Sequence, residues 1–212
     1  MELQLNHIQP SFERIDTQSD IWNRSRSFLS SNKRYLVKAA SGRGKTTLQK
    51  ILHGTYRNYE GIVLVADKTL SDMDSDQIAT YRCEEMSFIF QDLRLFPDLT
   101  AMENVLIKNE LTGFKSKDEV LAFFTALDMT EMIDRRCGEM SFGQQQRVAI
   151  IRALCQPFHF LVCDEPFSHL DDHNIDKACS LIEQELTDRQ ASLIMLSLDH
   201  GYSFLYSEQI NL

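Results

Sequence analysis

The chain has 212 residues, of which 43% are hydrophobic and 25% charged, a composition that excludes a largely disordered or low-complexity protein. Its net charge of −9 disfavours a general nucleic-acid binder, because an acidic surface repels phosphate backbones. No apolar run reaches the roughly 18 residues that cross a bilayer, and the first residues are too polar for a signal peptide. We therefore expect a cytosolic protein, with its five cysteines reduced because none forms a C-x-x-C pair.

Short strand patterns alternate with helical patterns along the chain. We expect strands at Leu3–Ile8, Tyr35–Ala40, Gly61–Ala66, Met86–Phe90, Phe158–Cys163, Ser192–Ser197 and Gln209–Leu212. We expect helices at about Lys45–His53, Lys117–Leu127, Phe142–Cys155 and Asp172–Thr187. Continuous apolar strands alternating with helices predict an α/β fold around a mostly parallel sheet. Residues 92–140 lack strand patterns, which predicts a mostly helical insertion.

A glycine-rich turn between the second expected strand and the first expected helix matches a phosphate-binding loop. Its residues are Ala39, Ala40, Ser41, Gly42, Arg43, Gly44, Lys45, Thr46 and Thr47. They fit the pattern G-x-x-x-x-G-K-[ST], with Ala39 at the first glycine position. The two glycines let backbone N–H groups turn towards phosphates, and the following helix adds its positive N-terminus. The pattern predicts that Lys45 contacts the β- and γ-phosphates of a nucleotide and that the Thr46 hydroxyl binds Mg²⁺.

Two carboxylates follow the apolar run that ends at Cys163. Asp164 and Glu165 would lie at the carboxyl edge of the sheet, where α/β folds bind ligands. A carboxylate in the position of Asp164 is suited to hold Mg²⁺ through water. One in the position of Glu165 is suited to orient or deprotonate an attacking water. Together with the phosphate loop, the two residues predict a nucleotide-hydrolysing site.

Three further segments make the sequence resemble the ATP-binding subunits of ABC transporters. Residues Phe88–Thr100 resemble the Q-loop of that family, and Met140–Arg147 resemble its LSGGQQQR signature. Residues Ser168–Asp171 resemble its D-loop. The order and spacing of these motifs match over essentially the whole chain. The residues of these motifs are similar to those of the lipoprotein-release, macrolide-exporter and cell-division type.

The resemblance implies a fold and an assembly. The fold would be a P-loop NTPase: a RecA-like core with a mostly parallel sheet, an N-terminal antiparallel β region and an inserted α-helical subdomain. One domain would span residues 1–212, with the core at about 1–91 and 144–212 and the helical subdomain at about 92–143. Two such domains would pair head to tail around two ATP molecules, each held by the phosphate loop of one subunit and the signature of the other.

The resemblance also implies roles for single residues. Gln91 would touch Mg²⁺ and the attacking water, and Phe12 would stack on adenine. Three signature residues would bind the ATP of the second subunit: Ser141, Gly143 and Gln144. Phe12 needs no hydroxyl to stack on adenine, because the π-face of its ring alone makes the contact.

Two positions depart from the family pattern. Phe142 replaces the first glycine of the signature, where its ring either fills space beside the nucleotide or points away from it. At the end of the last buried strand the family carries a histidine that contacts the γ-phosphate. A gapless comparison places Leu198 there, whereas a loop shifted by two residues places His200 near the site as a catalytic residue.

The sequence therefore predicts an ATP-hydrolysing subunit, with ATP and Mg²⁺, in a homodimer or paired with another ATPase subunit. It would drive or gate a separate transmembrane permease and reach the inner face of the cell membrane only through it. The alternative is an ATP-binding switch with weak or no hydrolysis. The helical insertion would dock the permease with apolar residues chosen from Leu93, Leu95, Phe96, Leu99, Val105 and Leu106.

Overall fold

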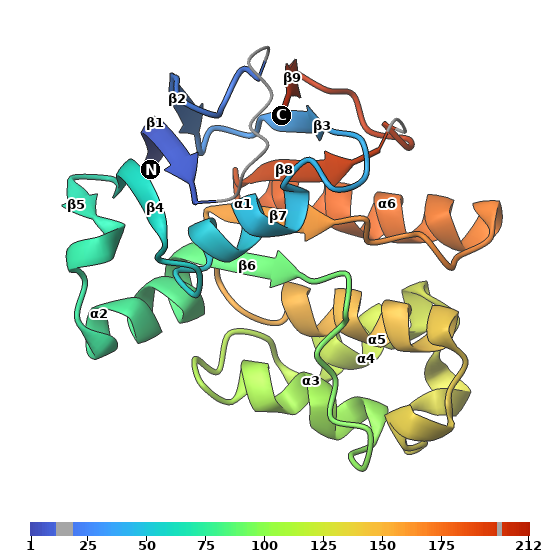
Figure 1. Cartoon of the computed structure of the whole chain (residues 1–212). Helices are drawn as coiled ribbons and strands as arrows, with labels where there is room; N and C mark the ends of the chain where they lie inside the picture. The colour runs from blue at the N-terminus through green and yellow to red at the C-terminus, as the bar shows by residue number, and fades with distance from the viewer. Residues whose placement is uncertain (12–18, 199–200) are drawn as a thin grey trace.

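The structure is a computed structural model that describes residues 1–11, 19–198 and 201–212 (Figure 1). Its strands are β1 (Glu2–Pro10), β2 (Ser25–Leu29), β3 (Arg34–Lys38), β4 (Tyr59–Val65), β5 (Lys68–Thr69), β6 (Met86–Ile89), β7 (Phe160–Asp164), β8 (Ser192–Ser197) and β9 (Glu208–Asn211). Its α-helices are α1 (Lys45–Leu52), α2 (Ser75–Thr80), α3 (Ala101–Asn109), α4 (Lys117–Ala126), α5 (Phe142–Leu154) and α6 (Asp172–Asp188). Four single helical turns complete the described elements: η1 (Leu70–Asp72), η2 (Tyr81–Glu85), η3 (Thr130–Met132) and η4 (Cys137–Glu139).

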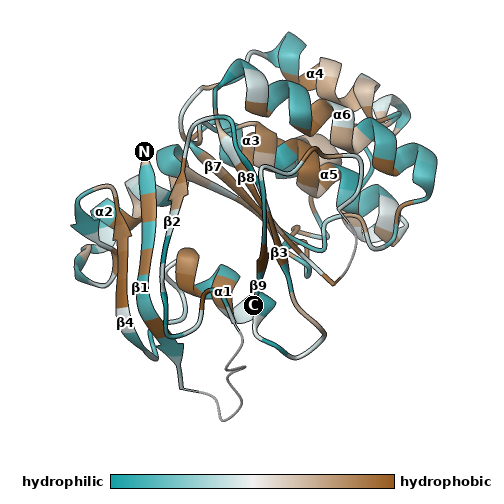
Figure 2. Ribbon diagram, turned by 90° about the horizontal axis from the view of Figure 1, so that it is seen from above, coloured by the Kyte–Doolittle hydropathy of each residue, from teal (hydrophilic) through white to brown (hydrophobic). Residues whose placement is uncertain are grey.

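A parallel sheet in the order β6-β7-β8-β3-β9 forms the centre of the molecule. Every residue of β7 and β8 is buried, as expected for strands covered on both faces. Alternate residues of β7 face opposite layers: Leu161 packs with α5 and α6, whereas Val162 packs with α1 and the second sheet. In Figure 2 the hydrophobic colour runs along the strands of this sheet, and hydrophilic residues lie on the outer faces of α4 and α6.

A second, antiparallel sheet in the order β2-β1-β4-β5 covers the face of the parallel sheet that carries α1. Leu5 lies opposite Val63 in this sheet, and both are fully buried. The pairing of β1 with β4 shifts between Asn6 and Gln9, where His7 has a positive φ of 53°. Gly61 is required beside this bulge, because a Cβ there would lie 2.3 Å from the backbone oxygen of His7.

The chain between β6 and β7 forms the helical layer with α3, α4 and α5, which lies below the parallel sheet in Figure 1. Each of these helices begins with a capping box. The pairs of side chains are Thr100 with Glu103, Ser116 with Glu119, and Ser141 with Gln144. A capping box satisfies two backbone N–H groups that the first turn would otherwise leave unpaired. None of the helices in the described part of the chain is long and apolar enough to cross a membrane.

These observations confirm the predicted fold class, a mostly parallel sheet with an N-terminal antiparallel region and an inserted helical layer. Three short elements were absent from the sequence prediction: β2, β5 and α2. In β2 only Phe28 is buried, because this strand lies at the sheet edge, so its sequence lacks an apolar pattern. Strand β5 has two residues and α2 has six, both shorter than a periodic pattern needs.

Candidate functional site

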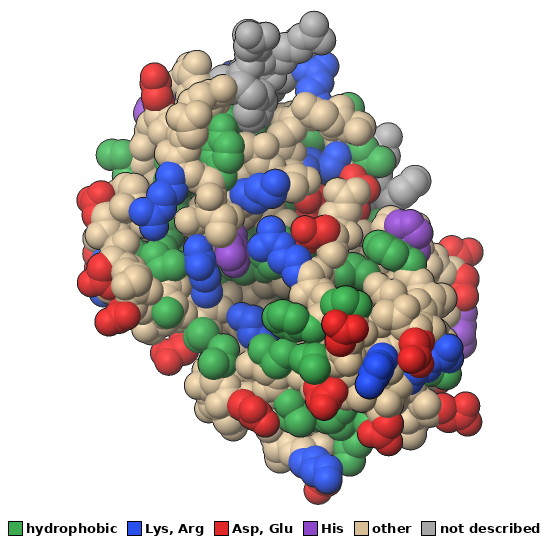
Figure 3. Space-filling model, turned by 60° about the horizontal axis from the view of Figure 1, so that its bottom comes forward, with side chains coloured by type: hydrophobic (Ala, Val, Ile, Leu, Met, Phe, Trp, Pro, Cys, Tyr) green, Lys and Arg blue, Asp and Glu red, His purple; other side chains and the backbone are tan. Residues whose placement is uncertain are grey.

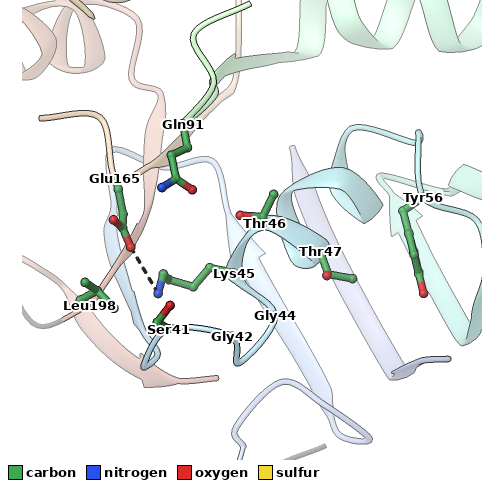
Figure 4. A pocket seen from close by; sticks show the side chains of 10 residues that line it. All are labelled: Ser41, Gly42, Gly44, Lys45, Thr46, Thr47, Tyr56, Gln91, Glu165 and Leu198. Atoms are coloured by element: carbon green, nitrogen blue, oxygen red, sulfur yellow. Dashed lines mark ion pairs between the residues drawn. The ribbon is translucent and has the colours of Figure 1, made fainter. Parts of the chain in front are cut away.

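A cleft of about 590 Å³ opens at the carboxyl edge of the parallel sheet (Figure 4). It is lined by Ser41, Gly42, Gly44, Lys45, Thr46, Thr47, Tyr56, Gln91, Glu165 and Leu198. The sheet register explains the convergence of segments that are distant in sequence. Lys38 lies beside Ser197, and Asp164 lies beside Leu196, so β3, β7 and β8 end at the same edge. The phosphate loop, the acidic pair and Leu198 therefore meet in one place.

The phosphate loop turns through two glycines with positive φ, 77° at Gly42 and 101° at Gly44. These angles are in the left-handed region, which a residue with a Cβ adopts only with strain. Gly44 is the N-cap of α1 and makes no side-chain cap, so the first N–H groups of this helix are left for a ligand. The loop and the helix end together form an anion-binding site of the size of a phosphate group.

The Lys45 ammonium, from the first turn of α1, is held inside the site by backbone and carboxylate oxygens. Its Nζ donates to the carbonyl of Ala39 at 2.7 Å and lies 3.3 Å from Oε1 of Glu165. Figure 4 shows the two charged side chains pointing towards each other across the cleft. A bound triphosphate offers Lys45 more negative charge than one carboxylate does. A triphosphate bound here would therefore separate Lys45 from Glu165.

The Asp164 carboxylate lies at the end of β7 and is only 1% exposed. Thr46 donates its hydroxyl to Oδ2 of Asp164 at 2.7 Å, while Oδ1 is buried and has no hydrogen-bond partner. Burial raises the pKa of Asp164, and the Thr46 hydroxyl partly opposes that shift. A buried carboxylate oxygen without a partner beside a hydroxyl fits a hard cation such as Mg²⁺. Among the described residues, no three His, Cys, Asp or Glu side chains could hold a metal by themselves, so a cation here would need phosphate and water oxygens as well.

Glu165 has a positive φ of 47°, and its backbone N–H donates to Leu196 at 3.1 Å. A non-glycine residue in this conformation is uncommon and stores strain that the surrounding structure must support. Here the neighbouring strand provides that support and directs the carboxylate into the cleft. Gln91 enters the cleft beside Glu165, two residues after the neighbouring strand β6 ends.

The structure places Leu198, not a hydrogen-bonding side chain, at the lining of the cleft. The leucine is 43% exposed there. His200 and Phe12 lie outside the described residues. Tyr56 lines the cleft and was not expected from the sequence. The sequence pattern that could have indicated Tyr56 is an aromatic residue shortly after the helix that follows the phosphate loop.

The signature residues do not line the cleft of the same chain. Ser141 and Gln144 bond to each other's backbone N–H groups at the start of α5, and Gly143 follows in the first turn. Phe142 is 42% exposed, and its ring lies 4.2 Å from that of His169 in the D-loop segment. Arg43 belongs to the phosphate loop but is not among the residues that line the cleft.

Residues 25–168 match the protein family described as ABC transporter. The chain is 32% identical over 166 residues to the lipoprotein-releasing system ATP-binding protein LolD of Saccharophagus degradans, which covers 77% of this chain and 73% of that protein. It is 31% identical over 200 residues to the macrolide export ATP-binding/permease protein MacB of Shigella flexneri. That match covers 93% of this chain but 31% of MacB, so the chain spans about a third of the length of that relative.

Two solved structures share the fold. A dimeric, post-hydrolysis state of the ATP-binding cassette MJ0796 bound to ADP and Pi has a TM-score of 0.79 and 24% identity, covering 93% of this chain and 88% of that one. A putative ABC transporter ATP-binding protein from Pyrococcus furiosus has a TM-score of 0.79 and 15% identity, covering 100% and 98%. The family match, the LolD relative and the architecture show that the chain belongs to the ABC transporter family, as an ATP-binding subunit that is similar to the lipoprotein-releasing and macrolide-export proteins.

Proposed function

We propose that this subunit hydrolyses MgATP in the cleft between the phosphate loop and β7 and uses closure of an ATP-bound dimer to drive a separate permease. The observation that carries the proposal is the meeting of Lys45, the Thr46–Asp164 pair and Glu165 in one cleft. The runner-up function is an ATP-dependent switch with little hydrolysis. The presence of Leu198 in the cleft is the observation that favours it.

Each side chain of the cleft has a chemical role in this proposal. Lys45 leaves Glu165 and neutralises charge on the β- and γ-phosphates. Thr46 and the Oδ1 atom of Asp164, which has no hydrogen-bond partner among the described residues, would hold Mg²⁺, and the ion would supply Lewis-acid polarisation of the phosphate oxygens. Glu165, released from Lys45, orients a water and accepts its proton. Gln91 lies beside Glu165 and positions the same water.

The remaining nucleotide contacts come from the rest of the loop and from a second subunit. Ser41, Gly42, Gly44 and Thr47 line the phosphate side of the cleft. Arg43 would contact the nucleotide from the outer side of the loop. Phe12 would contact the adenine together with Tyr56, which lines the cleft. A second subunit contributes Ser141, Gly143 and Gln144. We also propose one domain over residues 1–212, with the core at 1–91 and 144–212 and the helical part at 92–143.

The direct test is release of inorganic phosphate by the purified chain with ATP, in the presence of Mg²⁺ and of a chelator. We expect Mg²⁺-dependent release that increases when the permease is present. ATP binding without phosphate release, with the permease in the assay, would favour the switch. No ATP binding would contradict both functions.

Replacing Leu198 by histidine tests what limits turnover. We expect Leu198→His to raise the rate of phosphate release about 10-fold, because a ring N–H would stabilise charge on the γ-phosphate where leucine offers no donor. Leu205→His is the matched control, since Leu205 is 92% exposed and does not line the cleft. An unchanged rate in Leu198→His, measured at saturating MgATP, would show that this position does not limit hydrolysis.

A second hollow, of about 220 Å³, lies between the parallel sheet and the helical layer and provides the proposed permease-binding groove. Its aromatic lining comes from β6 and the following loop, namely Phe88, Phe90 and Phe96. Four cations line the same groove: Arg82, Arg94, Lys108 and Arg152. Figure 3 shows Lys and Arg side chains gathered around a hollowed area with hydrophobic side chains beside it.

The groove has an excess of positive charge in a chain whose net charge is −9. Burial, with other cations contributing, lowers the pKa of Lys108 and lowers that of Arg152 to about 10. Lys108 makes no ion pair with the residues that the structure describes. A permease segment that carries a carboxylate next to an apolar anchor would neutralise this charge and cover the aromatic lining. Such a segment would bring the subunit to the cytoplasmic face of the membrane.

The structure narrows the apolar residues that can make this contact. Leu93 and Val105 are buried in the cores of the chain and cannot act as anchors, whereas Phe96 is 52% exposed and lines the groove. We expect Phe96→Lys to reduce co-purification with the permease about 10-fold or more, because it removes the apolar anchor. Leu111→Lys is the control, since Leu111 is exposed on the helical layer outside the groove. Full permease binding by Phe96→Lys, with ATP binding intact, would place the docking surface elsewhere.

A further inference from the structure

The D-loop segment Ser168–Asp171 is held against α5 by a chain of hydrogen bonds that begins at Gln146. This glutamine is 1% exposed, and both ends of its amide contact the segment. Its Oε1 accepts the backbone N–H of His169 at 3.1 Å, and its Nε2 donates to the hydroxyl of Ser168 at 3.2 Å. Because a backbone N–H can only donate, it determines which end of the amide faces it. The orientation of Gln146 is therefore set by the backbone.

That orientation allows the His169 ring to carry its proton at Nε2. The oxygen of Ser168 accepts from Gln146 and can donate its own O–H to Nδ1 of His169, 2.9 Å away. An imidazole that accepts at Nδ1 carries its proton at Nε2 when it is neutral. The Nε2 atom has no hydrogen-bond partner among the residues that the structure describes. His169 is therefore an exposed side chain with a pre-oriented donor directed away from its own support.

Packing holds the ring in this position from a second side. The ring of Phe142, the residue that replaces the first signature glycine, lies 4.2 Å from the His169 ring at 54°. The next residue has to be Gly143, because a Cβ there would lie 2.8 Å from the backbone oxygen of His169. The D-loop histidine and the signature residues therefore form one rigid surface at the start of α5. In this arrangement the ring of Phe142 packs against the ring of His169 and supports it.

We propose that His169 acts across the dimer and donates its Nε2–H to the terminal phosphate of the ATP bound by a second copy of this chain. The inference rests on the proposed function, in which Ser141 and Gly143 of one subunit face the nucleotide of the other. It supplies a donor to a γ-phosphate whose own cleft is lined by Leu198. His169 is then a catalytic residue provided in trans.

The donor does not enter the covalent step. The water oxygen forms a bond to the γ-phosphorus, the bond from that phosphorus to the bridging oxygen breaks, and ADP leaves with the bonding electrons. Glu165 accepts the proton of the water. His169 keeps its proton and stabilises negative charge on the γ-phosphate oxygens, as a positioned donor does in other charged transition states.

Turnover of three variants tests the donor. His169→Ala is expected to lower the rate at saturating MgATP about 100- to 1,000-fold, the loss seen when one positioned donor is removed. Its ATP affinity as a monomer should stay unchanged, because His169 does not line the cleft of its own chain. His169→Gln should retain more activity than His169→Ala, because its amide N–H can still donate. His173→Ala, an exposed histidine on α6, should behave as the wild type.

The outcomes separate this inference from the proposed function. A wild-type chain that hydrolyses no ATP, with or without permease, would overturn the proposed function and this inference with it. A wild-type chain that hydrolyses ATP together with a fully active His169→Ala variant would overturn the inference alone. Equal loss in His169→Ala and His169→Gln would also overturn it, because the donor would then not be the group that matters.

Tandem fusions of two copies, joined by a flexible linker, test whether the histidine acts in trans. The reference fusion has one wild-type half and one Lys45→Ala half, so that only one phosphate loop works. Adding His169→Ala to the Lys45→Ala half should lower the rate towards background, because that half faces the working nucleotide. Adding it to the intact half should leave the reference rate unchanged. The opposite pattern, or equal rates in the two fusions, would overturn the assignment.

Discussion

Lys45→Ala is expected to weaken ATP binding about 100-fold or more and to abolish hydrolysis. The Lys45 ammonium is buried and lies against the loop carbonyl of Ala39 and the carboxylate of Glu165. Lys45 is the one cation among the described residues that line the cleft. Without it, the phosphates would face the uncompensated negative charge of Glu165. A hydrogen bond to a charged group contributes about 1.5–3 kcal/mol, which at the upper end corresponds to about 100-fold in affinity.

Lys50→Ala is the matched control for this variant. Lys50 lies in the last turn of the same helix and is exposed, so its loss should change neither binding nor turnover. Equilibrium binding of a fluorescent ATP analogue gives the affinity, and circular dichroism checks that both variants are folded. Wild-type affinity in folded Lys45→Ala would contradict the assignment of the phosphate loop.

Glu165→Gln should keep ATP binding, lower phosphate release about 100- to 10,000-fold, and accumulate an ATP-bound dimer. The substitution preserves the size of the side chain and removes the base that accepts the proton of the water. It also removes the charge that holds Lys45 in the empty cleft, so ATP affinity should rise. Dimer formation follows because hydrolysis, the step that opens the pair, is blocked.

Size-exclusion chromatography with MgATP and phosphate release measure the two effects of Glu165→Gln separately. Glu131→Gln is the control, since Glu131 is exposed in the helical layer. Wild-type turnover in Glu165→Gln would rule out Glu165 as the base. If Glu165→Gln releases phosphate slowly but stays monomeric with MgATP, closure of the dimer is blocked. The exposed Phe142–His169 pair would then be the first contact to test by mutation.

Two internal contacts hold the reactive side chains of the cleft. Lys45 is bound to Glu165, and Thr46 is bound to Asp164. Each contact keeps a reactive group satisfied while ATP is absent, which lowers the cost of burying charged and polar atoms. In the proposed function the phosphates take Lys45 from Glu165, while Thr46 can keep its hydrogen bond to Oδ2 of Asp164 because Oδ1 is available for the cation. Cation and phosphate binding should therefore be cooperative, because the phosphate oxygens supply ligands that the cation needs beside Thr46 and Asp164.

Local patterns in the sequence were sufficient to predict the phosphate loop, the acidic strand end and most core elements. The glycines at 42 and 44 allow a conformation that other residues avoid, so a turn between a strand and a helix is encoded by a few neighbouring residues. Strands β7 and β8 are apolar throughout because both faces are covered. The short edge strand β2 carries one buried side chain, so no periodic signal marks it.

Tertiary structure alone decided which side chains meet. The register of β8 with β3 and β7 brings Leu198 to the cleft beside the phosphate loop and Glu165. The contact of Phe142 with His169 joins residues from α5 and from the loop after β7. Sequence patterns report distances along the chain within one element. Contacts between elements depend on how sheets and helices pack, so the cleft lining and the exposed histidine donor could be found only in the folded chain.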